Sequence, residues 1–275
     1  MMHNSNTIRL VALDLDGTLL HDDKSISDYT LHVLRRLSEQ GIILIPASGR
    51  DLAGMKKNIL TLASIRYAIC SNGAVILDTC TEKHLAEFTI SPDSAFSILN
   101  YLDSLPVAYY AHTNLGRICS ENLGDEAFLK KYPFITPHPK ASPSVAAVLK
   151  EKNAAIYKLG LFTLDNRTFE LLMSENRPDP FLSFMRTGDG IIEINSAFAS
   201  KGNALSWICR KLEIPMEQVL TIGDNENDLS MLQMAGTSAA MGNAAADIKR
   251  AADYTADTNE NDGAAHFLSD FFHFH

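Results

Sequence analysis

The sequence predicts an α/β protein with a doubly wound, Rossmann-like parallel sheet, interrupted by an inserted α+β domain. Three observations carry this prediction. First, the apolar runs 8–13, 42–47 and 67–70 alternate with amphipathic helical patterns, which is typical of parallel strands covered on both faces. Second, this pattern gives way to hairpins and mixed helices from about residue 82. Third, the alternation of helix and strand resumes after about residue 190.

The helix expected after the first strand has clear signals at both ends. Ser27 is a favourable N-cap residue, and Gly41 stands where a helix commonly ends. Between them, Leu31, Leu34 and Leu37 recur at helical spacing. We therefore expect these leucines to form the buried stripe of the helix.

The changes of pattern predict two domains. Residues 1–82 and 191–275 are expected to form the α/β core, and residues 83–190 the inserted domain. The insert should contain a helix with Pro92 at its first position. The strand expected over 191–194 lies at the boundary, where it could still belong to the insert or to the exit from it.

Composition and charge limit the classes of function. The 275 residues carry 24 basic and 33 acidic side chains, a formal charge of −9. This balance argues against extended binding of nucleic acid or of an anionic membrane, although a bound cation can still attract a small anion into one cleft. No apolar run approaches the roughly 20 residues that span a bilayer. The four cysteines are scattered and no signal-peptide pattern is present, so we expect a cytoplasmic protein with reduced thiols.

Two acidic segments follow expected strand ends. The segment 14–18 (DLDGT) follows the first strand, and its glycine permits a turn in which Asp14 and Asp16 both face the crevice at the strand end. The segment 223–228 (GDNEND) follows a later buried strand. Carboxylates this close repel each other unless a cation lies between them, and Mg²⁺ prefers oxygen ligands. Alone, each segment could instead be a turn or a helix-capping loop.

Two further features fall at equivalent places. Ser48 and Gly49 follow the second strand, where a hydroxyl and a backbone N–H can bind a phosphate oxygen. Lys201 follows Ser200 at a helix N-terminus, an unfavourable place for a cation unless it faces an anion. Taken alone, these residues are better explained by a simple turn and a solvated lysine. Because all four features lie where strands of one sheet end, we expect them to converge on one crevice.

In this order, the four motifs closely resemble those of the haloacid dehalogenase superfamily. The motifs are DLDGT at 14–18, SGR at 48–50, SKG at 200–202 and GDNEND at 223–228. The chain is most similar to the Cof-type phosphatases, whose large α/β cap lies between the second and third motifs. The resemblance spans nearly the whole chain and includes the segments 71–73 (SNG), 193–194 (EI) and 261–264 (NDGA). Ser48 stands where many relatives have threonine, which keeps the hydroxyl.

The resemblance implies a Mg²⁺-dependent phosphatase that forms an aspartyl-phosphate. Asp14 is the implied nucleophile. Asp16 is the implied acid that protonates the leaving alkoxide, and then the base that activates water. The implied magnesium ligands are Asp14, Asp224 and the backbone carbonyl of Asp16.

The remaining implied roles concern the phosphoryl group and the rest of the substrate. The residues expected to bind them are Ser48, Gly49, Lys201 and Asn227. Asp228 is implied to orient Lys201 or a metal-bound water. The inserted domain is implied to act as a lid, and five of its residues could recognise a sugar: Tyr109, Tyr110, His112, Asn114 and Arg117.

The sequence leaves the phosphoryl acceptor and the substrate open. A phosphomutase or phosphotransferase would carry the same motifs. A non-catalytic regulator that binds a phosphorylated metabolite is disfavoured, because such a protein has no use for a nucleophile such as Asp14. The expected partner is a small phosphorylated metabolite, such as a sugar or cofactor phosphate, and no pattern reports the oligomeric state.

Overall fold

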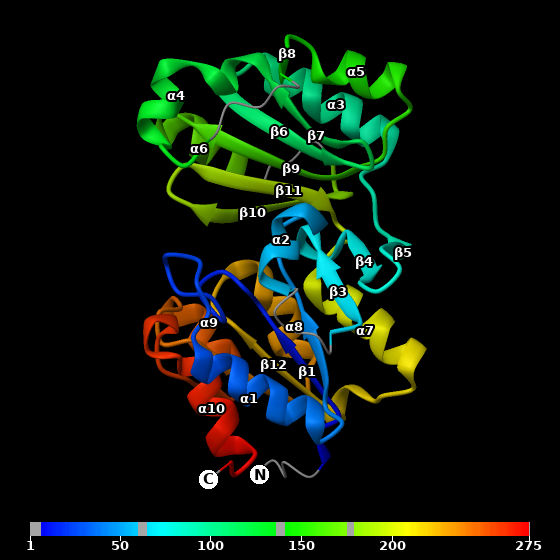
Figure 1. Cartoon of the computed structure of the whole chain (residues 1–275). Coiled ribbons are helices and arrows are strands. Elements are labelled where there is room, and N and C mark those ends of the chain that lie inside the picture. Colours follow the sequence, from blue (N-terminus) through cyan, green and yellow to red (C-terminus); the bar gives the residue numbers. More distant parts are fainter. Residues whose placement is uncertain (1–6, 60–64, 136–140, 175–178, 275) are drawn as a thin grey trace. The chain divides into compact units, whose positions relative to one another are not determined.

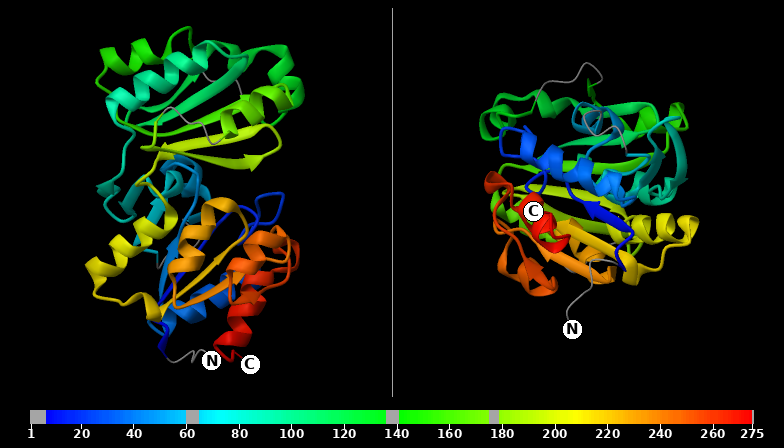
Figure 2. Two further views of the ribbon diagram at one scale, coloured as in Figure 1. Left: turned by 180° about the vertical axis from the view of Figure 1, so that it is seen from behind. Right: turned by 60° about the horizontal axis from the view of Figure 1, so that its bottom comes forward.

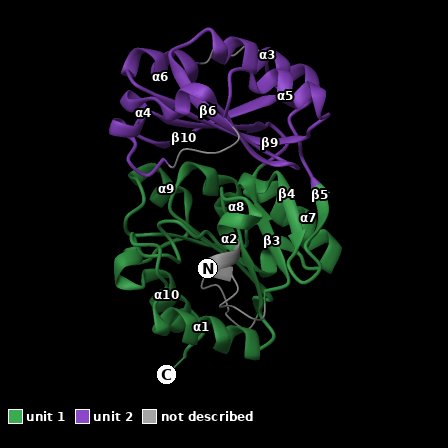
Figure 3. Cartoon of the chain, turned by 45° about the horizontal axis from the view of Figure 1, so that its top comes forward, with its two compact units in different colours: residues 1–86, 200–275 green, residues 87–199 purple. Residues whose placement is uncertain are grey.

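The computed structural model describes residues 7–59, 65–135, 141–174 and 179–274 (Figure 1). The chain forms two compact units (Figure 3). Unit 1 comprises Met1–Ala86 and Ser200–His275, and unit 2 comprises Glu87–Ala199. Within the described ranges, no helix combines the length and the apolar character that a membrane crossing requires.

Unit 1 is built on a five-stranded parallel sheet in the order β14-β13-β12-β1-β2. Its strands are β1 (Leu10–Leu13), β2 (Ile43–Pro46), β12 (Val219–Gly223), β13 (Thr237–Ala240) and β14 (Tyr254–Thr255). Strand β1 lies inside the sheet between β12 and β2, with Leu13 opposite Pro46 on one side and Ile222 on the other. All four residues of β1 are buried, as expected for a strand covered on both faces. The predicted α/β core with a parallel sheet is confirmed.

Helices cover both faces of this sheet. Helices α1 (Asp28–Glu39) and α10 (Gly263–Phe271) pack together on one face, and α7 (Lys201–Leu212) and α8 (Leu229–Met234) pack together on the other (Figures 1 and 2). Unit 1 also contains the helices α2 (Leu52–Ile59) and α9 (Ala246–Ala251). Ser27 caps α1, its Oγ accepting a hydrogen bond from the Thr30 N–H at 2.9 Å. The stripe prediction is wrong at Leu31, which is half-buried, whereas Val33 is buried beside Leu34 and Leu37.

The third expected parallel strand differs from the prediction. Strand β3 (Tyr67–Cys70) pairs antiparallel with β4 (Val75–Asp78), and β5 (Lys83–Glu87) extends this small sheet. Strand β3 meets the main sheet through one parallel bridge, between Ala47 and Ile69. A short turn, residues 71–73, reverses the chain and makes the antiparallel pairing possible.

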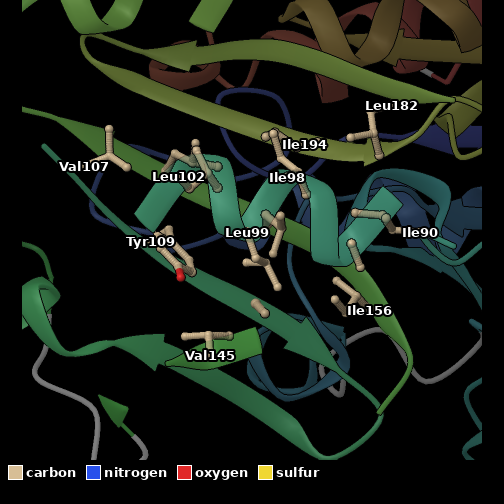
Figure 4. Close-up of a cluster of buried hydrophobic side chains, with 14 of the residues drawn as sticks. Ile90, Ile98, Leu99, Leu102, Val107, Tyr109, Val145, Ile156, Leu182 and Ile194 are labelled. Carbon is tan, nitrogen blue, oxygen red and sulfur yellow. The ribbon is translucent and has the colours of Figure 1, made fainter. Parts of the chain in front are cut away.

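Unit 2 contains a six-stranded sheet in the order β10-β11-β9-β6-β7-β8. Its strands are β6 (Val107–Thr113), β7 (Gly116–Ser120), β8 (Ala141–Ser142), β9 (Ile156–Thr163), β10 (Leu182–Gly188) and β11 (Ile191–Ser196). Helices α3 (Pro92–Asp103), α5 (Val145–Glu151) and α6 (Asn166–Met173) bury a large apolar cluster against one face. Figure 4 shows the part of this cluster to which α3 contributes Ile98, Leu99 and Leu102. Helix α4 (Glu126–Lys131) contributes Phe128 to a smaller cluster with Ala108 and Phe162 on the other face. Ser91 caps α3, and Pro92 is in its first turn as predicted.

The domain boundaries need one correction. The prediction that the core resumes at residue 191 is wrong for residues 191–199, because β11 pairs with both β9 and β10 in the sheet of unit 2. The first boundary lies at Ala86, a few residues after the predicted one, because β5 pairs with β4.

Candidate active site

The site lies where the order of strands reverses in the parallel sheet of unit 1. The chain runs from β1 to β2 on one side, and β12 later pairs on the other side of β1. Open α/β sheets bind their ligands beyond the carboxyl ends of strands at such a switch point. Asp14 directly follows β1 and Asp224 directly follows β12. The Asp14 N–H donates to the Ile222 carbonyl at 3.0 Å, which extends the ladder up to the first carboxylate.

Lys201 joins two carboxylates in the interior. Its Nζ donates to Asp14 Oδ1 at 2.5 Å and to Asp228 Oδ1 at 2.5 Å. The lysine side chain is fully buried, and Asp14 is only 4% exposed. Burial alone would lower the pKa of Lys201, but the carboxylates of Asp14 and Asp228 outweigh burial and raise it. Lys201 is therefore a fixed cation, which explains why it is tolerated at the N-terminus of α7.

Burial raises the pKa of the Asp14 carboxyl well above its ordinary value. The ammonium of Lys201 opposes this shift, and the neighbouring carboxylates of Asp228 and Asp224 add to it. Asp14 thus lies among like charges that favour the binding of a further cation.

Asp224 is held from the loop that follows β1. Thr18 donates from Oγ1 to Asp224 Oδ1 at 3.0 Å. Gly17 has a φ of +81°, and a Cβ there would lie 2.5 Å from Asp224 Oδ2, so glycine meets both a conformational and a steric demand. Burial, followed by the charge of Asp228, raises the pKa of Asp224 to about 6.

Asp228 organises the loop after β12. Its Oδ2 accepts hydrogen bonds from the N–H groups of Asp224 at 2.9 Å and Asn225 at 3.0 Å, while Oδ1 accepts from Lys201. This carboxylate is fully buried. Because both oxygens are already used, Asp228 suits the orienting role expected for it better than a role as a metal ligand.

The donor set fits Mg²⁺. Asp14, Asp224 and Asp228 each offer a carboxylate oxygen, and these oxygens lie within 4.8 Å of one another. A small, hard cation prefers such oxygen ligands. Since both oxygens of Asp228 already accept hydrogen bonds, three in all, Asp14 and Asp224 are the better ligands. The carbonyl of Asp16 as a third ligand stays a prediction.

Asp16 points to a different set of partners. Its two carboxylate oxygens accept hydrogen bonds from Nε and Nη2 of Arg50 at 2.7 Å and 2.6 Å. Lys24 Nζ lies 3.0 Å from Asp16 Oδ1. No role for Arg50 is predicted from the sequence, although its place directly after Ser48 and Gly49, at a strand end, is a signal for one.

The other expected phosphate-binding residues lie on loops of unit 1. Ser48 follows β2 and is 1% exposed, and its Oγ accepts a hydrogen bond from the Arg50 N–H at 3.2 Å. Gly49 lies in the same turn. Asn227 donates from Nδ2 to Asn72 Oδ1 at 3.1 Å. Its own Oδ1 is buried and has no hydrogen-bond partner within the described ranges.

The five residues singled out in the insert do not form one group. Tyr109 packs in the cluster under the helices, and its hydroxyl donates to Asp103 Oδ1 at 2.5 Å. Asn114 belongs to the hairpin turn, where Oδ1 accepts from the Ala155 N–H at 3.0 Å. Only three of the five gather: the Arg117 guanidinium lies 4.7 Å from the Tyr110 ring centroid, and its Nη2 is 3.3 Å from His112 Nε2.

Comparison with known proteins identifies the family. A model described as haloacid dehalogenase-like hydrolase matches residues 11–268. The chain belongs to this family. Among curated relatives, this haloacid dehalogenase-like hydrolase is 30% identical over 286 residues to phosphatase YwpJ of Bacillus subtilis (strain 168), covering 95% of this chain and 99% of the relative. The predicted superfamily and the prediction of a hydrolytic enzyme are confirmed.

Two further relatives agree with the assignment to the haloacid dehalogenase-like hydrolases. The 5-amino-6-(5-phospho-D-ribitylamino)uracil phosphatase YcsE of Bacillus subtilis (strain 168) is 27% identical over 262 residues, covering 94% of this chain and 93% of the relative. A solved haloacid dehalogenase-like hydrolase from B. subtilis superposes with a TM-score of 0.83 at 27% identity, covering 95% of this chain and 99% of that chain. The likeness therefore extends over both units of the chain.

Proposed function

We propose that this protein is a Mg²⁺-dependent phosphatase that hydrolyses small phosphate monoesters through an aspartyl-phosphate on Asp14. The observation that carries the proposal is the buried contact of Lys201 with Asp14 and Asp228, beside Asp224 at the switch point of the sheet. A buried carboxylate with a fixed cation on one side and a metal-binding carboxylate on the other has the environment that a phosphoryl-accepting nucleophile needs.

The first step is attack of an Asp14 oxygen on phosphorus. The bond from phosphorus to the ester oxygen breaks, and Asp16, which must be protonated and released from Arg50 at this point, gives its proton to the departing alkoxide, which leaves as an alcohol. In the second step Asp16 takes a proton from water, and the resulting hydroxide attacks phosphorus. The bond to Asp14 breaks, inorganic phosphate leaves, and both aspartates return to their starting states.

Other residues of the chain stabilise the charge of the transferring group. Mg²⁺, bound by Asp14 and Asp224, would neutralise charge on the phosphoryl oxygens. Lys201 contributes a second positive charge without a rearrangement, because Asp228 holds it in place. Ser48 and Gly49 are proposed to donate to phosphoryl oxygens, and Asn227 to contact the phosphoryl group or the adjoining substrate.

The substrate is proposed to be a sugar or cofactor phosphate. YcsE is named for a substrate whose phosphate is carried on a ribityl group, and a phosphate of this kind presents a small monoester with neighbouring hydroxyls. Unit 2 is proposed to act as a lid that contacts the organic part of the substrate.

The test is phosphate release from a panel of sugar, nucleotide and cofactor phosphates, with Mg²⁺ or with EDTA. Release should require Mg²⁺ and disappear in Asp14→Asn, whereas Asp28→Asn, which alters an exposed aspartate in the same unit, should behave as wild type. Release that persists in Asp14→Asn would refute the nucleophile. Phosphoryl recovered on an added sugar, instead of free phosphate, would identify a phosphotransferase.

A further inference from the structure

The turn formed by Ser71, Asn72 and Gly73, here called the SNG turn, has an unusual backbone. Its three residues have φ angles of +50°, +59° and +97°. Positive φ is uncommon for residues other than glycine, and asparagine tolerates it better than serine. All three residues are buried. Backbone strain of this kind persists only where the surroundings enforce it, and it is concentrated at functional sites.

The SNG turn is attached to the loop that carries Ser48. The Ser71 N–H donates to the Arg50 carbonyl at 2.8 Å, and the Asn72 N–H donates to the Ser48 carbonyl at 3.0 Å. These two hydrogen bonds fix the backbone on both sides of Gly49. The position of Ser48 therefore depends on the turn.

The same turn packs against the N-terminus of α7. A Cβ on Gly73 would lie 2.2 Å from the Ser200 carbonyl oxygen and 3.0 Å from the Lys201 nitrogen. Only glycine permits this approach. The backbone that carries Lys201 thus lies directly on the turn.

Asn72 makes the third connection, through its side chain. It is 1% exposed, and its Oδ1 accepts the hydrogen bond from Asn227 Nδ2 at 3.1 Å. The side-chain N–H of Asn227 is thus bonded to Asn72. The Oδ1 of Asn227 is buried and has no hydrogen-bond partner within the described part of the chain. Such an oxygen can accept a hydrogen bond from a donor that arrives with a ligand, such as a metal-bound water or a substrate hydroxyl.

We propose that Asn72 is a positioning residue of the phosphatase site, which orients the Asn227 amide from a turn that also fixes the loops of Ser48 and Lys201. This inference rests on the proposed function, because it assigns Asn72 a role in the same reaction. Asn72 acts through Asn227 and does not itself touch the reacting atoms.

The test is a double-mutant cycle between Asn72→Gly and Asn227→Ala. Glycine accepts the φ of +59° without steric cost, so this change removes the side chain and leaves the turn possible. The measured quantities are kcat/KM for p-nitrophenyl phosphate, the affinity for inorganic phosphate in the presence of Mg²⁺ by calorimetry, and the urea unfolding midpoint. Asn195→Ala is the matched control, because Asn195 is also fully buried but bonds to the Tyr157 carbonyl in unit 2.

We expect each single change to lower kcat/KM by about 10- to 100-fold, as loss of supporting contacts does at other sites. The kcat/KM of the double variant should be no lower than that of the less active single variant, because both changes remove the same contact between Asn72 and Asn227. Asn195→Ala combined with Asn227→Ala should instead give the product of the separate effects.

The inference would be overturned if Asn72→Gly kept the wild-type kcat/KM. It would also be overturned if the loss in the double variant equalled the product of the losses in the two single variants. If Asn72→Gly does not fold by the urea measurement, Asn72→Ala takes its place in the cycle. If even the wild type releases no phosphate, the proposed function fails. The phosphate-affinity cycle then still decides whether Asn72 and Asn227 act together.

Discussion

Arg50 holds both carboxylate oxygens of Asp16 in a two-point ion pair, with N–O distances of 2.6 Å and 2.7 Å. Burial would raise the pKa of Asp16, but the hydrogen bonds and charge of Arg50, assisted by Lys24, lower it. A carboxylate held in this way is a fixed acceptor. Before Asp16 can give a proton to a leaving alkoxide, it must exchange Arg50 for the substrate, so Arg50 governs when the proposed acid is available.

Replacing Arg50 by alanine removes the two hydrogen bonds that fix the position of the Asp16 carboxylate. A misplaced acid–base group should lower kcat/KM for an alkyl phosphate by about 100-fold, since general acid–base catalysis contributes roughly 10²- to 10⁴-fold. The loss should be smaller for p-nitrophenyl phosphate, because p-nitrophenolate leaves without a proton. Steady-state kinetics with the two esters measure the difference. Arg66→Ala is the control, because Arg66 is an exposed arginine paired with Asp78. Equal losses on both esters would mean that Arg50 serves phosphate binding alone.

Replacing Lys201 by methionine should destabilise the fold by about 3–5 kcal/mol, because two buried carboxylates lose their shared cation. Adding Asp228→Asn should restore part of this loss, since one of the uncompensated charges is then removed. Urea unfolding in EDTA gives both values, with the exposed Lys211→Met as control. A Lys201→Met variant as stable as wild type would contradict the view of Lys201 as the buried counter-ion.

Magnesium should stabilise the folded protein even without substrate. At 100 times its dissociation constant, a ligand that binds only the folded state adds about 2.7 kcal/mol, which for a chain of this size raises the melting temperature by roughly 5–10 °C. The shift should be lost in Asp224→Asn, which removes a proposed ligand. Thermal unfolding with Mg²⁺ or EDTA measures it. An unchanged shift in Asp224→Asn would place the ion elsewhere.

Alanine substitution at two glycines with positive φ, Gly41 and Gly73, can distinguish the cost of backbone strain from the cost of a steric clash. Gly41 has a φ of +80°, and apart from its chain neighbours no atom lies within 4 Å of a Cβ added there. Gly73 has a φ of +97°, and a Cβ added there would collide with the Ser200 carbonyl. Gly41→Ala should cost about 1–2 kcal/mol of stability from conformation alone. Gly73→Ala should cost more and should also lower kcat, because the added methyl group displaces the backbone of Lys201. Equal stability losses together with an unchanged kcat would show that the SNG turn does not constrain α7.

Asp262 supplies a pH-dependent contribution to stability. Its Oδ1 accepts hydrogen bonds from Thr30 Oγ1 and His21 Nε2, each at 3.0 Å. Burial would raise the pKa of Asp262, but hydrogen bonds with Ser27, His21 and Thr30 lower it. A lowered folded-state pKa means that the contribution is present above about pH 4 and is lost as the pH falls through the folded-state value. Asp262→Asn should therefore cost about 1 kcal/mol at pH 7, allowing for solvent screening.

Urea titrations of wild type and Asp262→Asn at pH 7 and at pH 3 check this sign. The difference between the two proteins should shrink in acid. A difference that is as large at pH 3 as at pH 7 would contradict it.

Local chemistry explains which parts of the fold are predictable from the sequence. Ser27 and Pro92 mark helix starts because capping depends only on neighbours along the chain. The strand ends carrying Asp14 and Asp224 follow from apolar runs that stop at acidic residues. The place of Lys201 at a helix N-terminus predicts that it faces an anion, and its ammonium contacts the Asp14 carboxylate.

The features that the sequence does not predict correctly depend on contacts between distant segments. An apolar run such as 67–70 fits a parallel or an antiparallel neighbour, so its pairing with β4 is not encoded in its own pattern. The strand Ile191–Ser196 is equally compatible with either sheet, and only its partners decide. The contact between Arg50 and Asp16 joins two loops, and nothing in either loop alone specifies it.

The discontinuity of unit 1 has a consequence for how the protein is made. Strand β1 takes its second partner, β12, from residues 219–223, after the whole of unit 2 has been synthesised. Unit 2 is a single continuous stretch and can complete its own sheet first, since domains generally fold as units. During synthesis, the catalytic centre would thus form last, when the segment that contains Lys201 and Asp224 has been made and β12 pairs with β1. A chain truncated before residue 200 and released from the ribosome would contain all of unit 2, but its Asp14 would lack Lys201 and Asp224.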